Sequence, residues 1–283
     1  KVPEVGQIIR NPDFGKSMRI MCDAEVAAKS QGRVAGIEAA RDAFYKGPIA
    51  KRIAEFIREN PVMDASGEAH AGLLSEEDMA EWEATIEQPV TYDYKGLDVY
   101  KCPPWTQGPV FLQQLAILKG FDLQGQGHNS PEYLHTVVES SKLAFADRDT
   151  YYGDPLFDET PLGMLLSEDY SVGRRELVGE TASMDFRPGD LGGGVPDYAL
   201  ASVADDNRRA LGIGARDVQD LGFDHAHVGD TTHLDAVDSE GNMVAATPSG
   251  GWLGTSPIIE GLGFPLGTRG QMFYLNPERP NAL

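Results

Sequence analysis

The sequence predicts an α+β fold in which helices come first and strands come later. Apolar residues recur at helical spacing through much of the first 150 residues, whereas a clear two-strand pattern begins after Asp230. The chain has 283 residues, of which 41% are hydrophobic, so it holds enough apolar material for a large core. This length allows one or two domains.

Two early helices are predicted on either side of Gly47-Pro48. From Arg33 to Tyr45 the apolar residues follow a spacing close to that of one helix face, and the Gly-Pro pair then interrupts it. A second amphipathic run places Ile49, Ile53 and Phe56 on a common face. We therefore expect two consecutive helices in this part of the chain.

A helix start, a hairpin and a further helix follow. Ser75, with acidic residues two and three positions later, has the pattern of a helix N-terminus. Val90 to Tyr94 and Leu97 to Tyr100 are rich in strand formers, and Lys95-Gly96 suits the turn between them. Pro109 to Leu118 is predicted to be helical.

The segment from Gly125 to Asn129 is predicted to be a polar loop. Ser130-Pro131-Glu132 then supplies an N-cap, a proline at the first helical position and an acid near the positive helix end. This helix is expected to run to about Phe145, with an apolar side that includes Leu134, Val138 and Leu143. Two long loops, Pro188 to Pro196 and Ala215 to Gly229, suggest a linker over about 188–230.

The strongest hairpin signal lies after Asp230. Thr231 to Val237 and Asn242 to Thr247 have strand patterns, and a polar turn separates them. A threonine at such a junction can act as an N-terminal nucleophile if the preceding bond is cut, because its free α-amine can take the hydroxyl proton. From spacing alone, an ordinary strand start is the better explanation of Thr231.

The charge balance excludes some classes of partner. There are 24 Lys and Arg residues against 44 Asp and Glu residues, a formal net charge of −20. Such a field repels nucleic-acid backbones and anionic membrane surfaces. No stretch approaches the roughly 20 apolar residues of a membrane-spanning helix. The two cysteines are too few for a disulfide scaffold or a cysteine-based zinc site.

Five motifs follow one another along the chain. One is the run that starts at Thr231, and the other four are Asp42 to Ala50, Leu73 to Asp78, Cys102 to Gly108, and Lys142 to Arg148 followed by Tyr152 to Pro155. Together they resemble the gamma-glutamyltranspeptidase family, whose members are Ntn hydrolases that cut themselves before a threonine. The run at Thr231 resembles the beginning of the family's small subunit, and the other four motifs are similar to parts of its large subunit.

The resemblance implies specific roles for residues around Thr231. Thr231 matches the nucleophile, which makes Asp230–Thr231 the implied scissile bond. Ser249 stands where the family usually has a threonine whose hydroxyl contacts the nucleophile. Thr232 and His233 match the motif and are expected to be structural. Nucleophile and base are then both protein groups, so no cofactor is expected.

Other positions depart from the gamma-glutamyl-specific pattern. Gly251 stands where those enzymes carry an asparagine that holds the substrate's head group. They also carry an acidic residue that pairs with the substrate's α-ammonium group; that position falls near Pro280 here, and Glu278 could substitute for the acid. Phe273 to Asn276 resembles one of their strands. The run around Arg269 resembles the hydrolase-like or cephalosporin-acylase-like branch, and Arg269 could bind a carboxylate of the acyl group or be a surface arginine. The substrate is therefore expected to be a gamma-glutamyl or related acyl amide, with water or an amino acid as acceptor.

The resemblance also implies a fold and a subunit arrangement. The fold is the Ntn-hydrolase four-layer αββα sandwich, which would be partial in this chain. Residues 1–230 would be the C-terminal part of the large-subunit region and 231–283 the start of the small-subunit region, associating as one composite domain. The family's carboxylate-binding arginine and oxyanion hole would fall outside the 283 residues. We therefore expect an internal portion of a precursor, weakly active or inactive alone.

Two other functions remain open from the sequence. The chain could be a non-catalytic relative that keeps the fold as a binding module, since Gly251 and the region near Pro280 have lost head-group residues. It could also bind a metal through His225 and His227, which would face the same way on a strand. The compartment is not determined, although the family is mostly periplasmic, secreted or surface-anchored.

Overall fold

The computed structural model describes residues 4–63, 67–200, 231–250, 256–267 and 269–282. The chain divides into two compact units. Unit 1 comprises Lys1–Ala84 and Leu221–Gln271, and unit 2 comprises Thr85–Asp220 and Met272–Leu283. Each unit thus combines chain from before and after Thr231, while the division into 1–230 and 231–283 stays a prediction.

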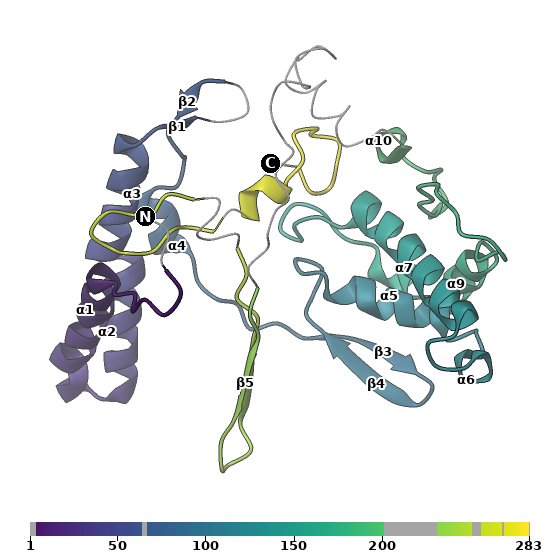
Figure 1. The fold of residues 1–283 in the computed structure, drawn as a ribbon, viewed down its shortest axis with the longest axis horizontal. Coiled ribbons are helices and arrows are strands. Elements are labelled where there is room, and N and C mark those ends of the chain that lie inside the picture. The colour runs from purple at the N-terminus through teal and green to yellow at the C-terminus, as the bar shows by residue number, and fades with distance from the viewer. Residues whose placement is uncertain (1–3, 64–66, 201–230, 251–255, 268, 283) are drawn as a thin grey trace. The chain divides into compact units, whose positions relative to one another are not determined.

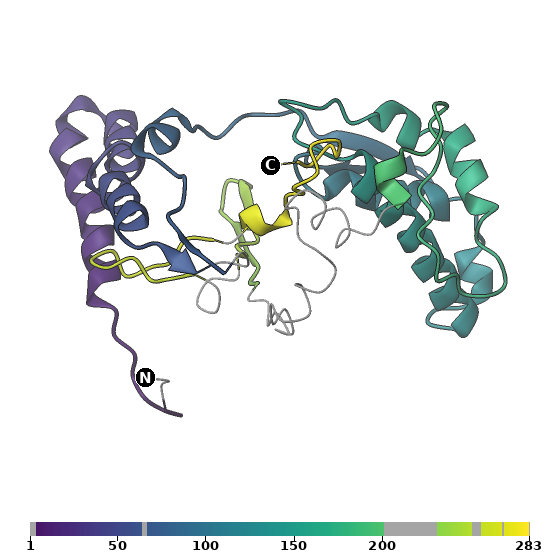
Figure 2. The ribbon, with the colours of Figure 1, turned by 90° about the horizontal axis from the view of Figure 1, so that it is seen from above.

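Unit 1 is built mainly of helices. Its elements are α1 (Pro12–Ala28), η1 (Lys29–Gln31), α2 (Arg33–Tyr45), α3 (Pro48–Glu59), β1 (Val62–Met63), β2 (Ala69–His70), α4 (Glu76–Glu81), β5 (Leu234–Val237), β6 (Met243–Ala246) and the start of η2 (Arg269–Met272). The first three α-helices lie side by side (Figures 1 and 2). None of the helices in the described ranges of either unit is long and apolar enough to cross a bilayer.

The core of unit 1 joins early helices to a late segment of the chain. Ile49 and Ile53 of α3 are fully buried, as the amphipathic pattern predicts, and Met79 of α4 packs with them. Ile259 and Leu262, which lie after the hairpin in sequence, complete the same cluster. Burial of such side chains contributes about 1.5–3 kcal/mol each, so this late segment is held firmly against the helices.

The helix α1 was not expected from the sequence. Its apolar residues are only half-buried against the core of unit 1, and its fully buried contact is polar. Ser17 is its fully buried residue, and the hydroxyl donates to the carbonyl of Leu262 at 2.9 Å. Asn11 caps the helix and also donates to the carbonyl of Gly263. Gly263 has a φ of +76°, and a Cβ there would lie 2.4 Å from the Asn11 side chain. This turn therefore requires glycine.

Unit 2 packs short helices around two longer ones. Its elements are β3 (Val90–Tyr94), β4 (Leu97–Lys101), α5 (Gly108–Leu118), α6 (Leu123–Gln126), α7 (Pro131–Tyr151), α8 (Leu162–Leu165), α9 (Glu168–Arg175) and α10 (Asp197–Leu200). The helix α5 contacts both α7 and α9. Ile117, Leu143 and Leu165 are fully buried between them.

The buried face of α7 is largely polar, contrary to the apolar face expected from the sequence. Leu143 is buried, but Leu134 and Val138 are about half exposed. Glu139 and Asp147 occupy the buried face instead. Burial raises the pKa of Asp147, and the charge of Arg174 opposes that shift. Ion pairs therefore determine which face of α7 is buried, and the spacing of apolar residues does not predict these ion pairs.

The predicted elements were largely confirmed at their expected places. The helices α2, α3, α4 and α5 and the β3–β4 hairpin match the sequence analysis, and Ser75 and Asp78 form a full capping box on α4. Two expectations were wrong in extent. The helix α7 continues to Tyr151, beyond the expected Phe145, because its polar contacts stabilise the last turns. The expected loop at Gly125 begins inside α6, which Asp122 caps.

Strands are short throughout the described residues. They form three two-stranded antiparallel sheets, β1–β2, β3–β4 and β5–β6. The observed mixture agrees with the α+β class, while the four-layer sandwich stays a prediction. The β5–β6 ribbon, green in Figure 1, is largely exposed along its length, and no third strand pairs with it among the described residues.

The last described residues fold onto unit 2 without forming the strand expected from Phe273 to Asn276. Within them Tyr274 makes a single parallel bridge to Ala282. Arg279 is buried, donates to the carbonyl of Tyr198 at 2.7 Å and lies over its ring. The close approach of Pro280 to Gly153 leaves no room for a side chain at that glycine. Turns therefore replace the strand here.

Candidate active site

The candidate nucleophile and its proposed partner are brought together by the β5–β6 register. Thr231 and Ser249 form an antiparallel bridge that continues the pairing of Leu234 with Ala246. Residues opposite each other on antiparallel strands point to the same face, so the two hydroxyls meet. Thr231 Oγ1 lies 2.7 Å from Ser249 Oγ, a hydrogen bond in which either oxygen can be the donor.

A cation also contacts this pair of hydroxyls. The guanidinium of Arg269, at the start of η2, donates to Ser249 Oγ. Because a guanidinium only donates, Ser249 must accept this bond, and its own hydrogen stays available for Thr231 Oγ1. A hydroxyl polarised by a cation is a better donor. The arrangement can therefore stabilise negative charge that develops on the Thr231 oxygen.

A second polar pair lies beside the first on the same face. The alternation of a strand places Thr231, His233 and Asp235 on one side. His233 Nδ1 lies 2.6 Å from Thr247 Oγ1, and Nε2 lies 3.1 Å from Asp235 Oδ2. Asp235 and Thr247 were not among the predicted site residues, although the strand period of two is the signal that could have found them.

The remaining candidate residues belong to unit 2 or lie outside the described residues. Asp230, Gly251 and the two histidines of the metal hypothesis, His225 and His227, lie outside the described residues. Within the described ranges, no group of three His, Cys, Asp or Glu side chains could hold a metal ion. Glu278 lies exposed in unit 2, where its backbone N–H donates to Asn276, and its substrate-binding role stays a prediction.

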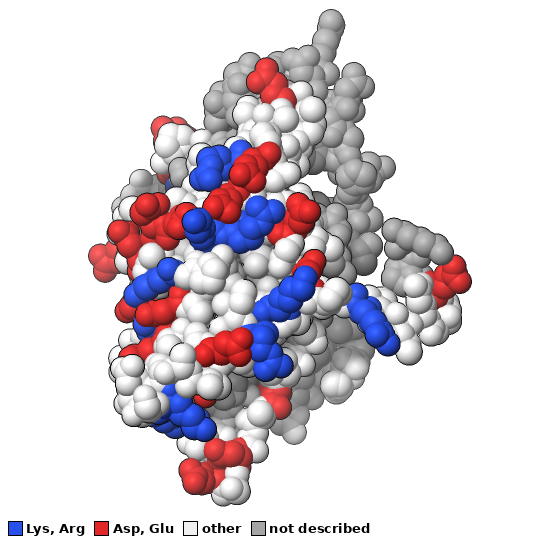
Figure 3. Space-filling model, turned by 90° about the vertical axis from the view of Figure 1, so that its left-hand side faces the viewer, with Lys and Arg blue, Asp and Glu red and all other residues white. Residues whose placement is uncertain are grey.

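Acidic and basic side chains are interspersed on the face of unit 1 that carries its first helices (Figure 3). Several pair along these helices, including Lys16 with Asp13 at 2.8 Å and Lys51 with Glu55 at 3.9 Å. Such exposed pairs contribute about 0–1 kcal/mol each. This face therefore presents no single-signed patch that would attract a polyanion.

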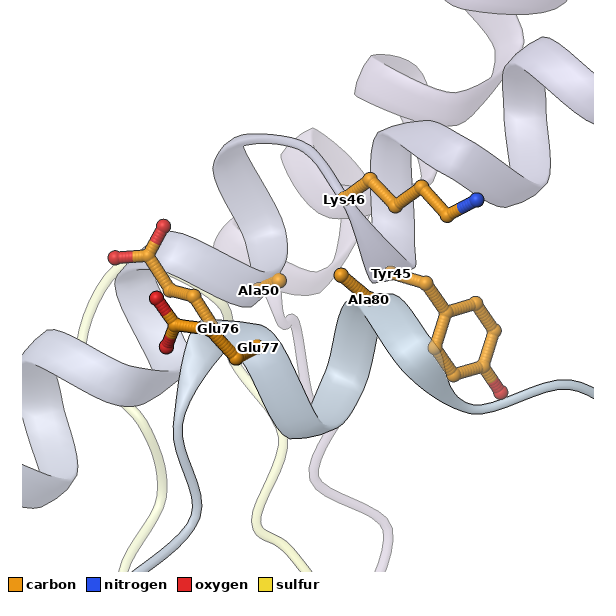
Figure 4. Close-up of a pocket in the computed structure, with 6 residues that line it drawn as sticks. All are labelled: Tyr45, Lys46, Ala50, Glu76, Glu77 and Ala80. Atoms are coloured by element: carbon orange, nitrogen blue, oxygen red, sulfur yellow. The ribbon is translucent and has the colours of Figure 1, made fainter.

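A small hollow lies between the α2–α3 junction and α4 (Figure 4). It has a volume of about 180 Å³ and is lined by Tyr45, Lys46, Ala50, Glu76, Glu77 and Ala80. Pockets for small organic ligands usually enclose about 300–1,000 Å³. The hollow is therefore smaller than such a pocket, and the Thr231–Ser249 pair remains the better candidate site.

Comparison with known proteins identifies the family. The sequence profile described as "Gamma-glutamyltranspeptidase" matches residues 1–283, which is the whole chain. The chain belongs to the gamma-glutamyltranspeptidase family. The match agrees with the resemblance carried by the five motifs.

Relatives of this gamma-glutamyltranspeptidase-family chain include hydrolases and acylases. It is 29% identical over 246 residues to the glutathione hydrolase proenzyme of Escherichia coli, an alignment covering 85% of the chain and 35% of the relative. The solved structure of LmbA2991HD is 45% identical with a TM-score of 0.84, and the match covers all of this chain and 45% of that one. The cephalosporin acylase from Bacillus halodurans is 25% identical with a TM-score of 0.68, covering 100% and 40%.

The alignments with two of the curated relatives include 85% of this chain. The chain spans only about a third of the length of these relatives. These relatives are described as proenzymes, a term for precursors that mature by processing. The family therefore supports a hydrolase or transferase type of enzyme.

Proposed function

We propose that Thr231 is the nucleophile of an autoprocessing amidohydrolase or acyltransferase. The observation that carries this proposal is the 2.7 Å hydrogen bond between Thr231 Oγ1 and Ser249 Oγ. Arg269, which donates to the same serine, adds a positive charge beside the reacting oxygen. Membership of the gamma-glutamyltranspeptidase family supports the same chemistry.

The proposed processing step cuts the chain before Thr231. The Thr231 hydroxyl attacks the carbonyl carbon of Asp230, and the C–N bond breaks as the proton passes to the departing nitrogen. The resulting ester between Asp230 and Thr231 is hydrolysed by water, which leaves a carboxylate on Asp230 and a free α-amine on Thr231. Ser249 stabilises the alkoxide character of the attacking oxygen through its hydrogen bond.

In turnover the free α-amine of Thr231 serves as the general base. It takes the hydroxyl proton as the oxygen attacks a substrate amide, and it returns a proton to the leaving amine. The acyl ester on Thr231 is then released to water or to an amino-acid acceptor. No cofactor takes part in this scheme.

We further propose a gamma-glutamyl or related acyl amide as substrate. The glutathione hydrolase and cephalosporin acylase relatives support this class of amide. Arg269 lies beside the nucleophile, where its positive charge could attract a carboxylate of the acyl chain. Gly251 and Glu278 complete the proposed substrate-binding set.

After cleavage, the two pieces are proposed to stay associated as large and small subunits. Residues after Thr231 contribute Ile259 and Leu262 to the core of unit 1, and they bury Arg279 against unit 2. These contacts do not depend on the peptide bond at position 230. The processed protein should therefore keep both pieces under native conditions.

Intact mass under denaturing conditions tests the proposal. We would measure this chain and a longer protein that carries the flanking parts found in its relatives. Cleavage should yield pieces spanning 1–230 and 231–283 from this chain, and Thr231→Ala should abolish it. Thr232→Ala is the matched control, because its side chain points to the opposite face and cleavage should persist. If neither protein is cut although both fold, a non-catalytic binding module becomes the better account.

A further inference from the structure

The strand pairing beside Thr231 has a weak point in its backbone hydrogen bonds. The register that pairs Leu234 with Ala246 continues without a bulge to Thr231 and Ser249, so Thr232 lies opposite Pro248. The N–H of Thr232 donates to the carbonyl of Pro248 at 3.2 Å. Proline has no N–H to return this bond. The pairing next to the nucleophile is therefore held by one backbone hydrogen bond where two are usual.

A side-chain hydrogen bond lies at the next pair and offsets this loss. His233 is opposite Thr247, one position from the proline, and Nδ1 of its ring lies 2.6 Å from Thr247 Oγ1. The two strands approach most closely at pairs that do not exchange backbone hydrogen bonds, and such pairs alternate with those that do. A short polar pair at this position can therefore hold the two strands in register.

Asp235 determines which ring nitrogen of His233 carries the proton. A carboxylate only accepts hydrogen bonds, so Nε2 must carry the hydrogen that it shares with Asp235 Oδ2 at 3.1 Å. In the neutral ring Nδ1 is then an acceptor, and Thr247 donates to it. The hydroxyl hydrogen of Thr247 is thereby directed toward His233.

We propose that His233 is a positioning residue, which through Thr247 holds the register in which Thr231 faces Ser249. This role rests on the proposed function for its effect on catalysis, but the strand register exists independently of any reaction. His233 itself contacts neither hydroxyl of the Thr231–Ser249 pair in the structure. Its effect passes through the backbone of the two strands.

A double-mutant cycle on the rate of cleavage before Thr231 tests the role. A cross-strand pair contributes up to about 1 kcal/mol, which corresponds to a rate loss of about fivefold for His233→Ala or Thr247→Val. The double variant should lose no more than either single variant, because both remove the same bond. His233→Asn should recover part of the rate, since its amide lies near the place of Nδ1. If the rate loss of the double variant equals the product of the two single losses, the proposal is overturned. It is also overturned if His233→Asn recovers none of the rate.

Hydrogen exchange at the Thr232 amide gives a readout that needs no activity. In the uncleaved Thr231→Ala protein this amide should exchange about fivefold faster once His233→Ala or Thr247→Val is added. Thr232→Val is the control for loss of the residue 232 hydroxyl and should leave the protection factor of this amide unchanged, once the intrinsic exchange rate of valine is used as the reference. Unchanged exchange in the His233 and Thr247 variants would refute the register argument. Absence of cleavage in every protein, with the expected exchange, would instead refute only the proposed function.

Discussion

Replacing Asp147 with alanine should strongly destabilise unit 2. The carboxylate is fully buried, accepts three hydrogen bonds and forms one ion pair. Gln113 Nε2 and Tyr170 OH donate to one oxygen at 2.5 and 2.8 Å. The Gly189 N–H donates to the other oxygen at 2.7 Å, and Arg174 Nη2 lies 3.1 Å from it. The group therefore fixes the chain at Gly189 onto α7.

The size of the effect follows from what alanine would leave behind. Arg174 is only 4% exposed, so removing Asp147 leaves a buried guanidinium without its counter-charge. Breaking a buried ion pair in this way costs about 3–5 kcal/mol. Asparagine should cost less, because Gln113 can turn its amide. The Oε1 atom of that glutamine is buried with no hydrogen-bond partner and could accept from the new amide.

Urea unfolding, followed by far-UV circular dichroism, measures this difference. Asp149→Ala is the matched control, because this residue lies on the same helix and pairs with Arg148 at a partly exposed position. That pair should contribute less than about 1 kcal/mol. If Asp147→Ala costs no more than Asp149→Ala, the carboxylate does not compensate Arg174 and the reasoning fails.

Three further predictions concern local features. Burial is the largest single influence on the pKa of Glu139 and raises it, but the hydrogen bonds from Lys142 and Ser183 and the charges of Lys142 and Arg187 together outweigh burial and lower this pKa. The unfolded state therefore binds more protons in acid, so stability falls as pH falls, and Glu139→Gln should flatten this loss in unfolding curves taken at several pH values. Ser75→Ala should cost about 0.5–2 kcal/mol in urea unfolding by removing the cap of α4, whereas a cost no larger than that of an exposed serine elsewhere would contradict the capping role. Gly263→Ala should lower the melting temperature, because its φ is +76° and its Cβ site is filled, and an unchanged temperature would mean that the turn rearranges freely.

Local elements could be predicted where one signal decides them. The Gly47-Pro48 break separates α2 from α3, and Ser75 caps α4, because these residues act on their own backbone. The β3–β4 turn follows from Lys95 and Gly96, both of which have positive φ in the structure. The position of the β5–β6 hairpin followed from strand patterning, and its register brought Thr231 to Ser249.

Contacts between distant residues could not be predicted in the same way. The fully buried contact of α1 is a serine, and α7 buries Glu139 and Asp147, so apolar residues alone do not reveal how either helix packs. The place of Arg269 beside Ser249 was also not determined by the motif. Each of these contacts depends on a partner far along the chain, and the spacing of apolar residues in the sequence does not identify that partner.

The sequence by itself determined the family, the helical and strand segments, and the threonine at which the chemistry is proposed to occur. It did so because motifs, caps and turns act over a few residues. Only the tertiary structure decided that residues after Thr231 enter the core of unit 1 and that His233 bonds to Thr247. Those outcomes depend on burial and on polar groups satisfying each other, which is settled only when distant segments meet.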